Sequence, residues 1–352
     1  MKKKLSLILS GILCAVLLTG CTKLPNSGFA GTYWTQNPIY KQVEENFYEK
    51  IEYTVTSEAE YEGKKLDSMG NSENLYFAVD SNKSSYVTEL YAENGLYVYK
   101  TALTLYGEYV FGGESVVVEG DFTETETTFK GMENGFACVK SVKKIKNVLP
   151  TSSKPTSKDE FKTISVTITT EYGEKNATHT LTGDEVSKSY FSSLKEPVTV
   201  KKYNKKAYIE NDLMMLMARN FSYESSLNYV FSTIESATGE LTQMQIAPDS
   251  KATNNGESAD QTTAFKTLDV NCQIDDVIRT VKFNTFRIKF STTGEYAQDF
   301  TYAYYANTLD NDTKDEHNLS RHYMVKCYRP AIYNTAYMVF TLDKVSHVKP
   351  AN

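Results

Sequence analysis

The densest group of acidic and histidine side chains lies between residues 310 and 322. It consists of Asp310, Asp312, Asp315, Glu316, His317 and His322. Closely spaced aspartates could supply the oxygen ligands that Ca²⁺ prefers. The segment lacks the glycine and the later glutamate of an EF-hand loop, and no cysteine is spaced to complete a zinc site. We therefore expect a solvated loop, no metal site and no cofactor, with Asp310, Asp312 and Asp315 as the best ligands if a metal were bound there.

Hydrolytic chemistry would need a nucleophile within reach of a base. The chain has four histidines, and none lies in a local motif such as G-x-S-x-G or H-E-x-x-H. Gly112-Gly113 is not followed by a helix or a lysine placed to bind phosphate. Two carboxylates could still converge from distant strands, as they do in glycosidases. Because no catalytic motif is present, we expect a protein that is not an enzyme.

The first 21 residues have the layout of an export signal. Three lysines at positions 2–4 precede an apolar stretch from Leu5 to Leu17, and Leu18-Thr19-Gly20-Cys21 follows. This order is typical of a signal peptide, and the apolar stretch is shorter than the ~20 residues of a membrane-spanning helix. The small residues before Cys21 resemble the lipobox of bacterial lipoproteins.

This resemblance implies that residues 1–20 are removed and that lipid is attached to Cys21. The protein would then be anchored at the outer face of the cytoplasmic membrane or elsewhere in the cell envelope. A secretory leader with an accidental cysteine is the alternative. No later segment has the length and apolarity of a transmembrane helix.

Charge and cysteine content narrow the choice of partners. The formal net charge is -6, and removing the three leader lysines makes the body more acidic. An acidic body argues against binding to nucleic acid, and against binding anionic lipids through a basic patch.

Cys138, Cys272 and Cys327 remain in the mature body, so at most one disulfide can form. We expect Cys272 and Cys327 either to pair or to be two buried free thiols.

The mature chain divides into a tether and a body. Residues 21–36 are rich in turn-forming residues and would form the tether, and residues 37–352 would form a β-rich body. Asn37-Pro38 is typical of a helix start, and Ile39, Val43 and Phe47 then recur every four residues towards Ile51. Residues 149–160 are expected to be a surface loop or a joint between subdomains, and residues 247–263 a loop.

Alternating apolar and polar residues predict strands over most of the body. From residue 52 they follow one another without helical segments between them, so we expect an antiparallel meander. Asn94-Gly95 predicts a tight hairpin, because both central residues of a type I′ turn need positive φ. A second helical region is expected to begin at Asn211, with a first part from Leu213 to Arg219 and a second part from Tyr223 to Glu235 after a possible break. In the second part, Leu227, Val230, Phe231 and Ile234 have helical spacing.

This order of elements resembles the LolA/LppX-type lipoprotein-carrier superfamily. The resemblance covers mainly Asn37 to Thr101, more loosely Asn211 to Val345, and contains no diagnostic residue motif. It implies an α+β fold, mostly antiparallel β, in which a bent meander sheet forms an incomplete barrel and helices cover its concave face. It also implies that acyl chains are sheltered between sheet and helices.

Adaptable apolar residues in the second helical region are the candidates for lining such a groove. They are Leu213, Met214, Met215, Leu216, Met217, Leu227 and Phe231. Ordinary core packing would explain the same residues. The expected function is that of a non-catalytic, membrane-anchored lipoprotein that binds a lipid or other hydrophobic ligand. The alternative is a surface module that binds protein or glycan through some of its 26 tyrosines and has no internal cavity.

Overall fold

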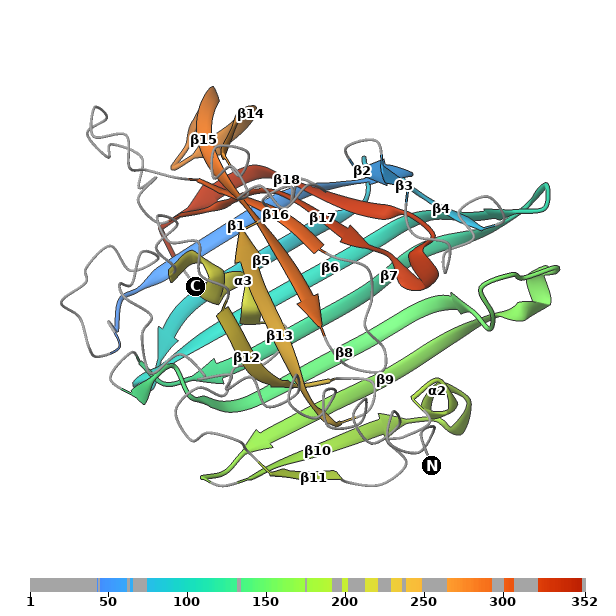
Figure 1. Cartoon of the computed structure of the whole chain (residues 1–352), viewed down its shortest axis with the longest axis horizontal. Coiled ribbons are helices and arrows are strands. Elements are labelled where there is room, and N and C mark those ends of the chain that lie inside the picture. Colours follow the sequence, from blue (N-terminus) through green and yellow to red (C-terminus); the bar gives the residue numbers. More distant parts are fainter. Residues whose placement is uncertain are drawn as a thin grey trace, which may run out of the picture.

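The computed structural model describes most of the body of the chain between Val43 and Lys349 (Figure 1). The described residues are 43, 45–61, 64–65, 75–131, 134–174, 176–191, 198–201, 213–220, 229–235, 239–248, 265–292, 301–306 and 322–349. Cys21 and the segments expected to be a leader and a tether lie outside these residues.

Eighteen strands make up almost all of the described chain. The first nine are β1 (Tyr48–Glu58), β2 (Glu60–Tyr61), β3 (Lys64–Lys65), β4 (Tyr76–Val79), β5 (Ser85–Glu93), β6 (Leu96–Phe111), β7 (Glu114–Phe129), β8 (Cys138–Pro150) and β9 (Phe161–Tyr172). The others are β10 (Asn176–Gly183), β11 (Val198–Lys201), β12 (Tyr229–Ile234), β13 (Leu241–Pro248), β14 (Phe265–Ile274), β15 (Val277–Thr292), β16 (Thr301–Ala306), β17 (Met324–Pro330) and β18 (Tyr337–Ser346).

The expected α+β fold, with helices over a concave sheet, is wrong. The described α-helices are α2 (Glu185–Ser189) and α3 (Met214–Met217), and each is too short to cover a sheet. Short 3₁₀ turns accompany them: η2 (Lys158–Glu160), η4 (Ala218–Asn220) and η7 (Ile332–Asn334). Strands β14 to β18 close into a five-stranded barrel, because β14 pairs with β15 on one edge and with β18 on the other. The molecule is therefore a barrel-like β-protein with additional strands.

The first predicted helix is wrong at its C-terminal end, because Tyr48 begins β1. Residues spaced by four, such as Phe47 and Ile51, share a face in a strand as well as in a helix, since four is a multiple of the strand period of two. Ile51, Tyr53 and Val55 are all buried, and β1 pairs with β5 and β18 along its two edges. This pairing on both edges fixes the extended conformation.

The second predicted helical region is helical only between Leu213 and Asn220 within the described residues. Tyr229–Ile234 is β12 instead, paired with β13 in an antiparallel hairpin. Aromatic and β-branched residues dominate β12 and favour a strand. The hairpin at Asn94-Gly95, by contrast, is confirmed: both residues have positive φ, and Glu93 pairs with Leu96.

One continuous sheet joins the long strands to the barrel, in the order β11-β10-β9-β8-β7-β6-β5-β1-β18-β17-β16-β15-β13-β12. Figure 1 shows β12 and β13 in front of the long strands. Contact between the two layers is direct, since Tyr172 and Ala177 of β9 and β10 pack against Ile234 and Leu241. The sheet is thus folded over itself, with its main core between the layers. None of the described helices has the length and apolarity that a membrane span requires.

Candidate functional site

Two neighbouring rows of side chains on the inner face of the sheet are rich in polar groups. This face carries core residues such as Phe47 and Phe129, and directly paired residues project to the same face. Across paired strands, one row consists of Glu49, Leu90, Tyr99, Thr127, Ser141, Thr170 and His179. The next row consists of Ile51, Thr88, Thr101, Thr125, Lys143, Ile168 and Leu181. We name the polar members of both rows the polar band.

The polar band is largely buried and contains its own hydrogen bonds. The hydroxyls of Thr127 and Ser141 lie 3.1 Å apart, and Oγ1 of Thr170 lies 2.8 Å from Nδ1 of His179. Thr127 is 1% exposed and His179 is 2% exposed. Burying such groups costs free energy unless hydrogen bonds replace those made to water. An interior that only had to pack itself would gain from valine at the threonine positions.

A hydroxyl beside an imidazole could in principle be activated as a nucleophile. Thr170 and His179 have this geometry, but they are 3% and 2% exposed. A substrate would have to enter the interior to reach them. The contact is equally explained as mutual satisfaction of two buried polar groups.

A buried ion pair lies at the β1 end of the polar band. Arg219 follows α3 and donates from Nη1 to Oε1 of Glu49 over 2.6 Å and from Nη2 to Oε2 over 3.0 Å. Burial alone would lower the pKa of Arg219, but the Glu49 carboxylate more than offsets this and the pKa is raised. Arg219 is therefore charged beside this carboxylate. The short helix thus has a clear structural role, which is to place a cation over the inner face of β1.

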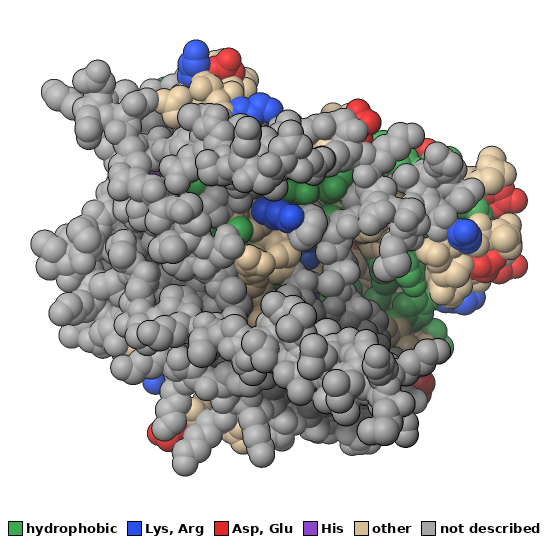
Figure 2. Space-filling model, in the orientation of Figure 1, with side chains coloured by type: hydrophobic (Ala, Val, Ile, Leu, Met, Phe, Trp, Pro, Cys, Tyr) green, Lys and Arg blue, Asp and Glu red, His purple; other side chains and the backbone are tan. Residues whose placement is uncertain are grey.

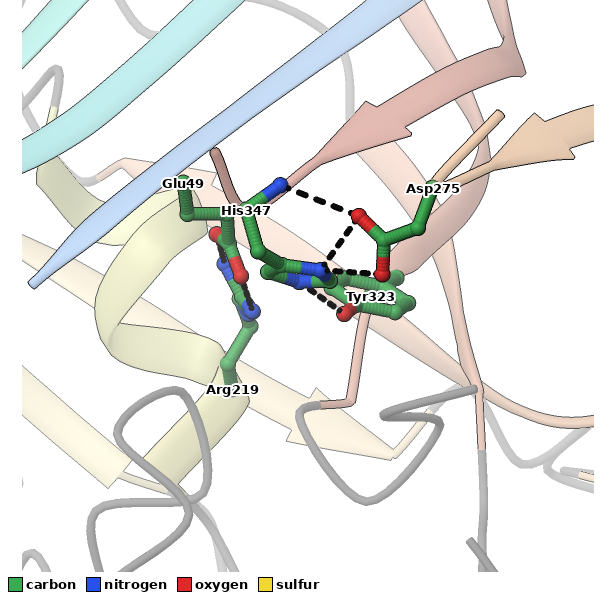
Figure 3. A network of polar contacts seen from close by, with 5 residues as sticks. All are labelled: Glu49, Arg219, Asp275, Tyr323 and His347. Atoms are coloured by element: carbon green, nitrogen blue, oxygen red, sulfur yellow. Dashed lines mark hydrogen bonds and ion pairs between the residues drawn. The ribbon is translucent and has the colours of Figure 1, made fainter. Parts of the chain in front are cut away.

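A second set of polar contacts connects this ion pair to the surface (Figure 3). Nδ1 of His347 lies 2.8 Å from Oδ2 of Asp275, and its Nε2 lies 2.7 Å from the hydroxyl of Tyr323. The ring of Tyr323 lies under Arg219, whose guanidinium carbon is 5.3 Å from the ring centroid. The side chain of Asp275 is 40% exposed, whereas that of Glu49 is 2% exposed.

The same contacts hold the seam at which the five-stranded barrel closes. Pairing of β14 with β18 is parallel and short, from Gln273 with Lys344 to Ile274 with Val345. The backbone N–H of His347 donates to Oδ1 of Asp275 over 3.1 Å, and that of Asp275 donates to the carbonyl of Val345 over 3.1 Å. The contacts between Asp275 and His347 therefore extend the short pairing of β14 with β18 by side-chain hydrogen bonds.

His322 lies next to Tyr323 and also faces the ion pair. Burial, together with the positive charge of Arg219, lowers the pKa of His322 to about 4. Its imidazole is therefore neutral at ordinary pH. Its φ of 51° lies in the left-handed region, which is uncommon for residues other than glycine.

Five of the seven candidate groove residues lie in the main core or pack against it. Leu213, Met214, Leu216 and Met217 are at most 1% exposed and belong to the main core, and Met215 packs against it. Phe231 is in β12, paired with Met244. Leu227 lies outside the described residues, as do Asp310, Asp312 and Asp315, so the structure places none of these four.

Cysteine and metal chemistry can be assessed only over the described residues. There, Cys138, Cys272 and Cys327 are buried free thiols, so the second of the two alternatives holds for Cys272 and Cys327. No group of three or more histidine, cysteine, aspartate or glutamate side chains in this part of the chain is arranged to hold a metal ion.

One cluster of tyrosines, formed by strand β2 and strands of the barrel, is buried. Tyr61 of β2 stacks on Tyr302 with centroids 4.2 Å apart, and its hydroxyl lies 3.1 Å from that of Tyr304. Tyr337 belongs to the same cluster. All four residues are at most 8% exposed. This cluster is therefore not an exposed aromatic surface.

Sequence reasoning missed both the polar band and the ion pair. Threonine alternates with glutamate in β7, and this alternation alone does not say which of the two faces the interior. Thr125 and Thr127 point inwards, whereas Glu124 and Glu126 point outwards. No sequence pattern links Glu49 to Arg219, because the two are brought together only by the folded sheet.

No protein-family model and no curated protein matches this chain. Among solved structures, the chain is similar to a crystallised β-barrel-like protein of a domain of unknown function (DUF1849) from Brucella abortus. The sequences are 9% identical, the match covers 86% of this chain and 98% of that chain, and the TM-score is 0.45. At this level the likeness carries no argument about function. What the described residues establish is a barrel-like, antiparallel β-protein with a polar band enclosed in its interior.

Proposed function

We propose that this chain is a lipoprotein, anchored through Cys21 outside the cytoplasmic membrane, that encloses an amphipathic ligand against the inner face of its sheet. The observation that carries the proposal is the polar band, which lies buried between apolar rows. No catalytic step is proposed for it. The sequence led us to expect a lipid or other hydrophobic ligand. We propose in addition that this ligand carries a polar group.

Free energy favours this explanation over a simply packed core. Leaving a buried hydroxyl without a partner costs about 1–3 kcal/mol. The polar band meets this cost in part with its own hydrogen bonds, and a polar group of an enclosed ligand would add further partners there. Each inner threonine could otherwise be a valine of nearly the same shape.

Apolar surface on both sides of the band supports a ligand that is mostly apolar. On one side lie Phe47, Tyr97 and Phe129. On the other lie Leu103, Ile145 and Val166, and beyond them a cluster that includes Phe111 and Phe161. Figure 2 shows hydrophobic side chains on the right-hand part of the surface in this view. A polar group bound at the band could therefore carry apolar chains in either direction.

The test is to find the ligand and then to remove its polar contacts. Protein purified from its own host should release a lipid in native mass spectrometry and after organic extraction. The variant Thr127→Val/Ser141→Ala removes both partners of one inner hydrogen bond, which can be nearly neutral for stability. We expect it to fold and to lose the adduct.

A matched control changes two threonines that are paired on the outer face. Thr169→Val/Thr180→Val alters the same chemistry on β9 and β10 but faces away from the band. It should keep the adduct. Wild-type protein without any adduct, or loss of the adduct only in the control, would contradict the proposal.

A further inference from the structure

Three large aliphatic residues are exposed near the closing seam of the barrel, two on opposite faces of the first residues of β15 and one just after β18. Val277, Ile278 and Val348 are 52%, 71% and 74% exposed. They are three of the seven large hydrophobic residues that are exposed in the described part of the chain. The contacts between Asp275 and His347 place the start of β15 beside the residue that follows β18. We name Val277, Ile278 and Val348 the aliphatic patch.

The aliphatic patch lies where the N-terminal segment enters the body. Lys50 of β1 pairs with Ser346 of β18, so Tyr48, the first residue of β1, is beside the end of β18. The chain therefore enters β1 close to Val348. Cys21 precedes Tyr48 by 27 residues, and an unstructured linker of that length would have an r.m.s. span of roughly 30 Å.

We propose that the aliphatic patch faces the membrane and that its side chains insert at the lipid–water interface. This inference rests on the proposed anchoring through Cys21. Removing an aliphatic side chain from water is favourable in proportion to the apolar area that it buries. Three side chains would bind lipid only weakly by themselves, but an anchor raises the effective concentration of lipid to the millimolar range. A weak contact is then enough to orient the body.

Charge around the patch fits an uncharged lipid surface better than an anionic one. Asp276 is exposed beside Val277, and Asp275 accepts a hydrogen bond from the backbone N–H of His347 and lies 2.8 Å from its ring nitrogen. The exposed Lys349 follows Val348, and its Nζ lies 5.5 Å from the ring centroid of Tyr91. Lysine and tyrosine side chains with apolar stems suit the headgroup region. The proposed contact is therefore apolar, with positive and negative groups at its rim.

The test uses a tryptophan as a depth probe. The chain has one tryptophan, Trp34, so the variant Trp34→Phe/Ile278→Trp carries a single probe in the patch. The full chain would be matured in its host and reconstituted into phosphatidylcholine vesicles, some of which contain lipid brominated near the glycerol end of the acyl chain. We expect emission at shorter wavelength than for the protein without vesicles, and quenching by the brominated lipid.

Val117 provides a matched control. It is 61% exposed near the β6–β7 turn, at the right-hand edge of Figure 1, while β14 and β15 lie at the upper left. Trp34→Phe/Val117→Trp should show neither change. Equal quenching of the two probes would overturn the proposed orientation, and so would an emission shift of the patch probe that depends on protein concentration but not on lipid.

Failure of the anchor can be separated from failure of the patch. The mass of the mature N-terminal peptide shows whether Cys21 carries diacylglycerol. If the protein is acylated but the probe in the patch is not quenched, the proposed membrane contact of the patch is wrong, while the proposed anchoring stands. If Cys21 is not acylated, the proposed anchoring fails, and the patch is tested on vesicles that bind an N-terminal histidine tag, with quenching again required.

Discussion

The guanidinium of Arg219 and the carboxylate of Glu49 form a two-point ion pair although 170 residues separate them in the sequence. Their side chains are 5% and 2% exposed. Taking two charges out of water costs about as much as their attraction returns, so the pair adds little net stability. Each partner nevertheless depends strongly on the other. The pair therefore specifies how the segment after α3 docks on β1.

Removing one partner of this pair should destabilise the protein strongly. Glu49→Gln or Arg219→Met leaves a buried charge without its counterion, and we expect a loss of about 3–5 kcal/mol in the free energy of unfolding. The double variant Glu49→Leu/Arg219→Met removes both charges and should regain most of this loss. Urea unfolding measures all three. A double variant as unstable as the sum of the single variants would show that the two charges are not coupled.

His322 should make stability fall in mild acid. Its pKa is about 4 in the folded protein and 6.5 in the unfolded chain, so the unfolded state binds more protons between these values. The stability associated with neutral His322 is therefore present above pH 6.5 and is lost as the pH falls towards 4, by up to about 3 kcal/mol. His322→Asn tolerates the positive φ and should remove this dependence. Unfolding curves at pH 4.5 and 7 test it, and an unchanged difference between the two pH values would contradict it.

Asp121 should make stability fall as the pH rises, which is opposite to the effect of His322. Burial raises the pKa of this carboxyl from 3.8 to about 7, against the hydrogen bond that its Oδ2 accepts from Val148. The folded state then holds a proton that the unfolded state releases. Stability is complete below pH 4 and is lost as the pH rises through 7.

Asp121→Asn should therefore be more stable than the wild type at pH 8, by about 2–3 kcal/mol, and similar to it at pH 4. Between about pH 4 and 6.5, His322 makes stability rise with pH, whereas Asp121 makes it fall. Replacing His322 should therefore lower the slope of stability against pH in this range, and replacing Asp121 should raise it. Parallel profiles for the wild type and Asp121→Asn would show that this carboxyl is ionised throughout.

The residue types at Asn94-Gly95 predicted the hairpin there more reliably than the spacing of apolar residues predicted the helices. Asn94-Gly95 specifies its turn because positive φ is needed at both positions, whatever surrounds it. Apolar residues spaced by four, as at Phe47 and Ile51, fit two structures equally well. Pairing with β5 and β18 decides between them, and the pairing with β18 joins residues almost 300 positions apart. Such contacts cannot be seen in a local pattern.

The candidate site was even less accessible from the sequence. Whether Thr127 faces water or the interior depends on which face of the sheet is folded inwards, and alternation gives only the period. The partners of Tyr323 illustrate the same limit: His347 follows β18, whereas Arg219 follows α3. Methionines at 214, 215 and 217 did mark an interior segment. They did not reveal that the charged residue next to them in the fold, Arg219, fixes that segment in place.

Thiol chemistry offers a test that does not depend on any ligand. Cys138, Cys272 and Cys327 are buried, and burial raises the pKa of Cys327 to about 12, so the reactive thiolate is scarce in the folded protein. Apart from Cys21, we expect very slow reaction with a thiol reagent in native buffer. Unfolding in guanidinium without reductant should then release three reactive thiols. A single reactive thiol would mean that two of the cysteines are bridged in the protein as isolated, and that β14 and β17 approach each other more closely than the free thiols in the structure indicate.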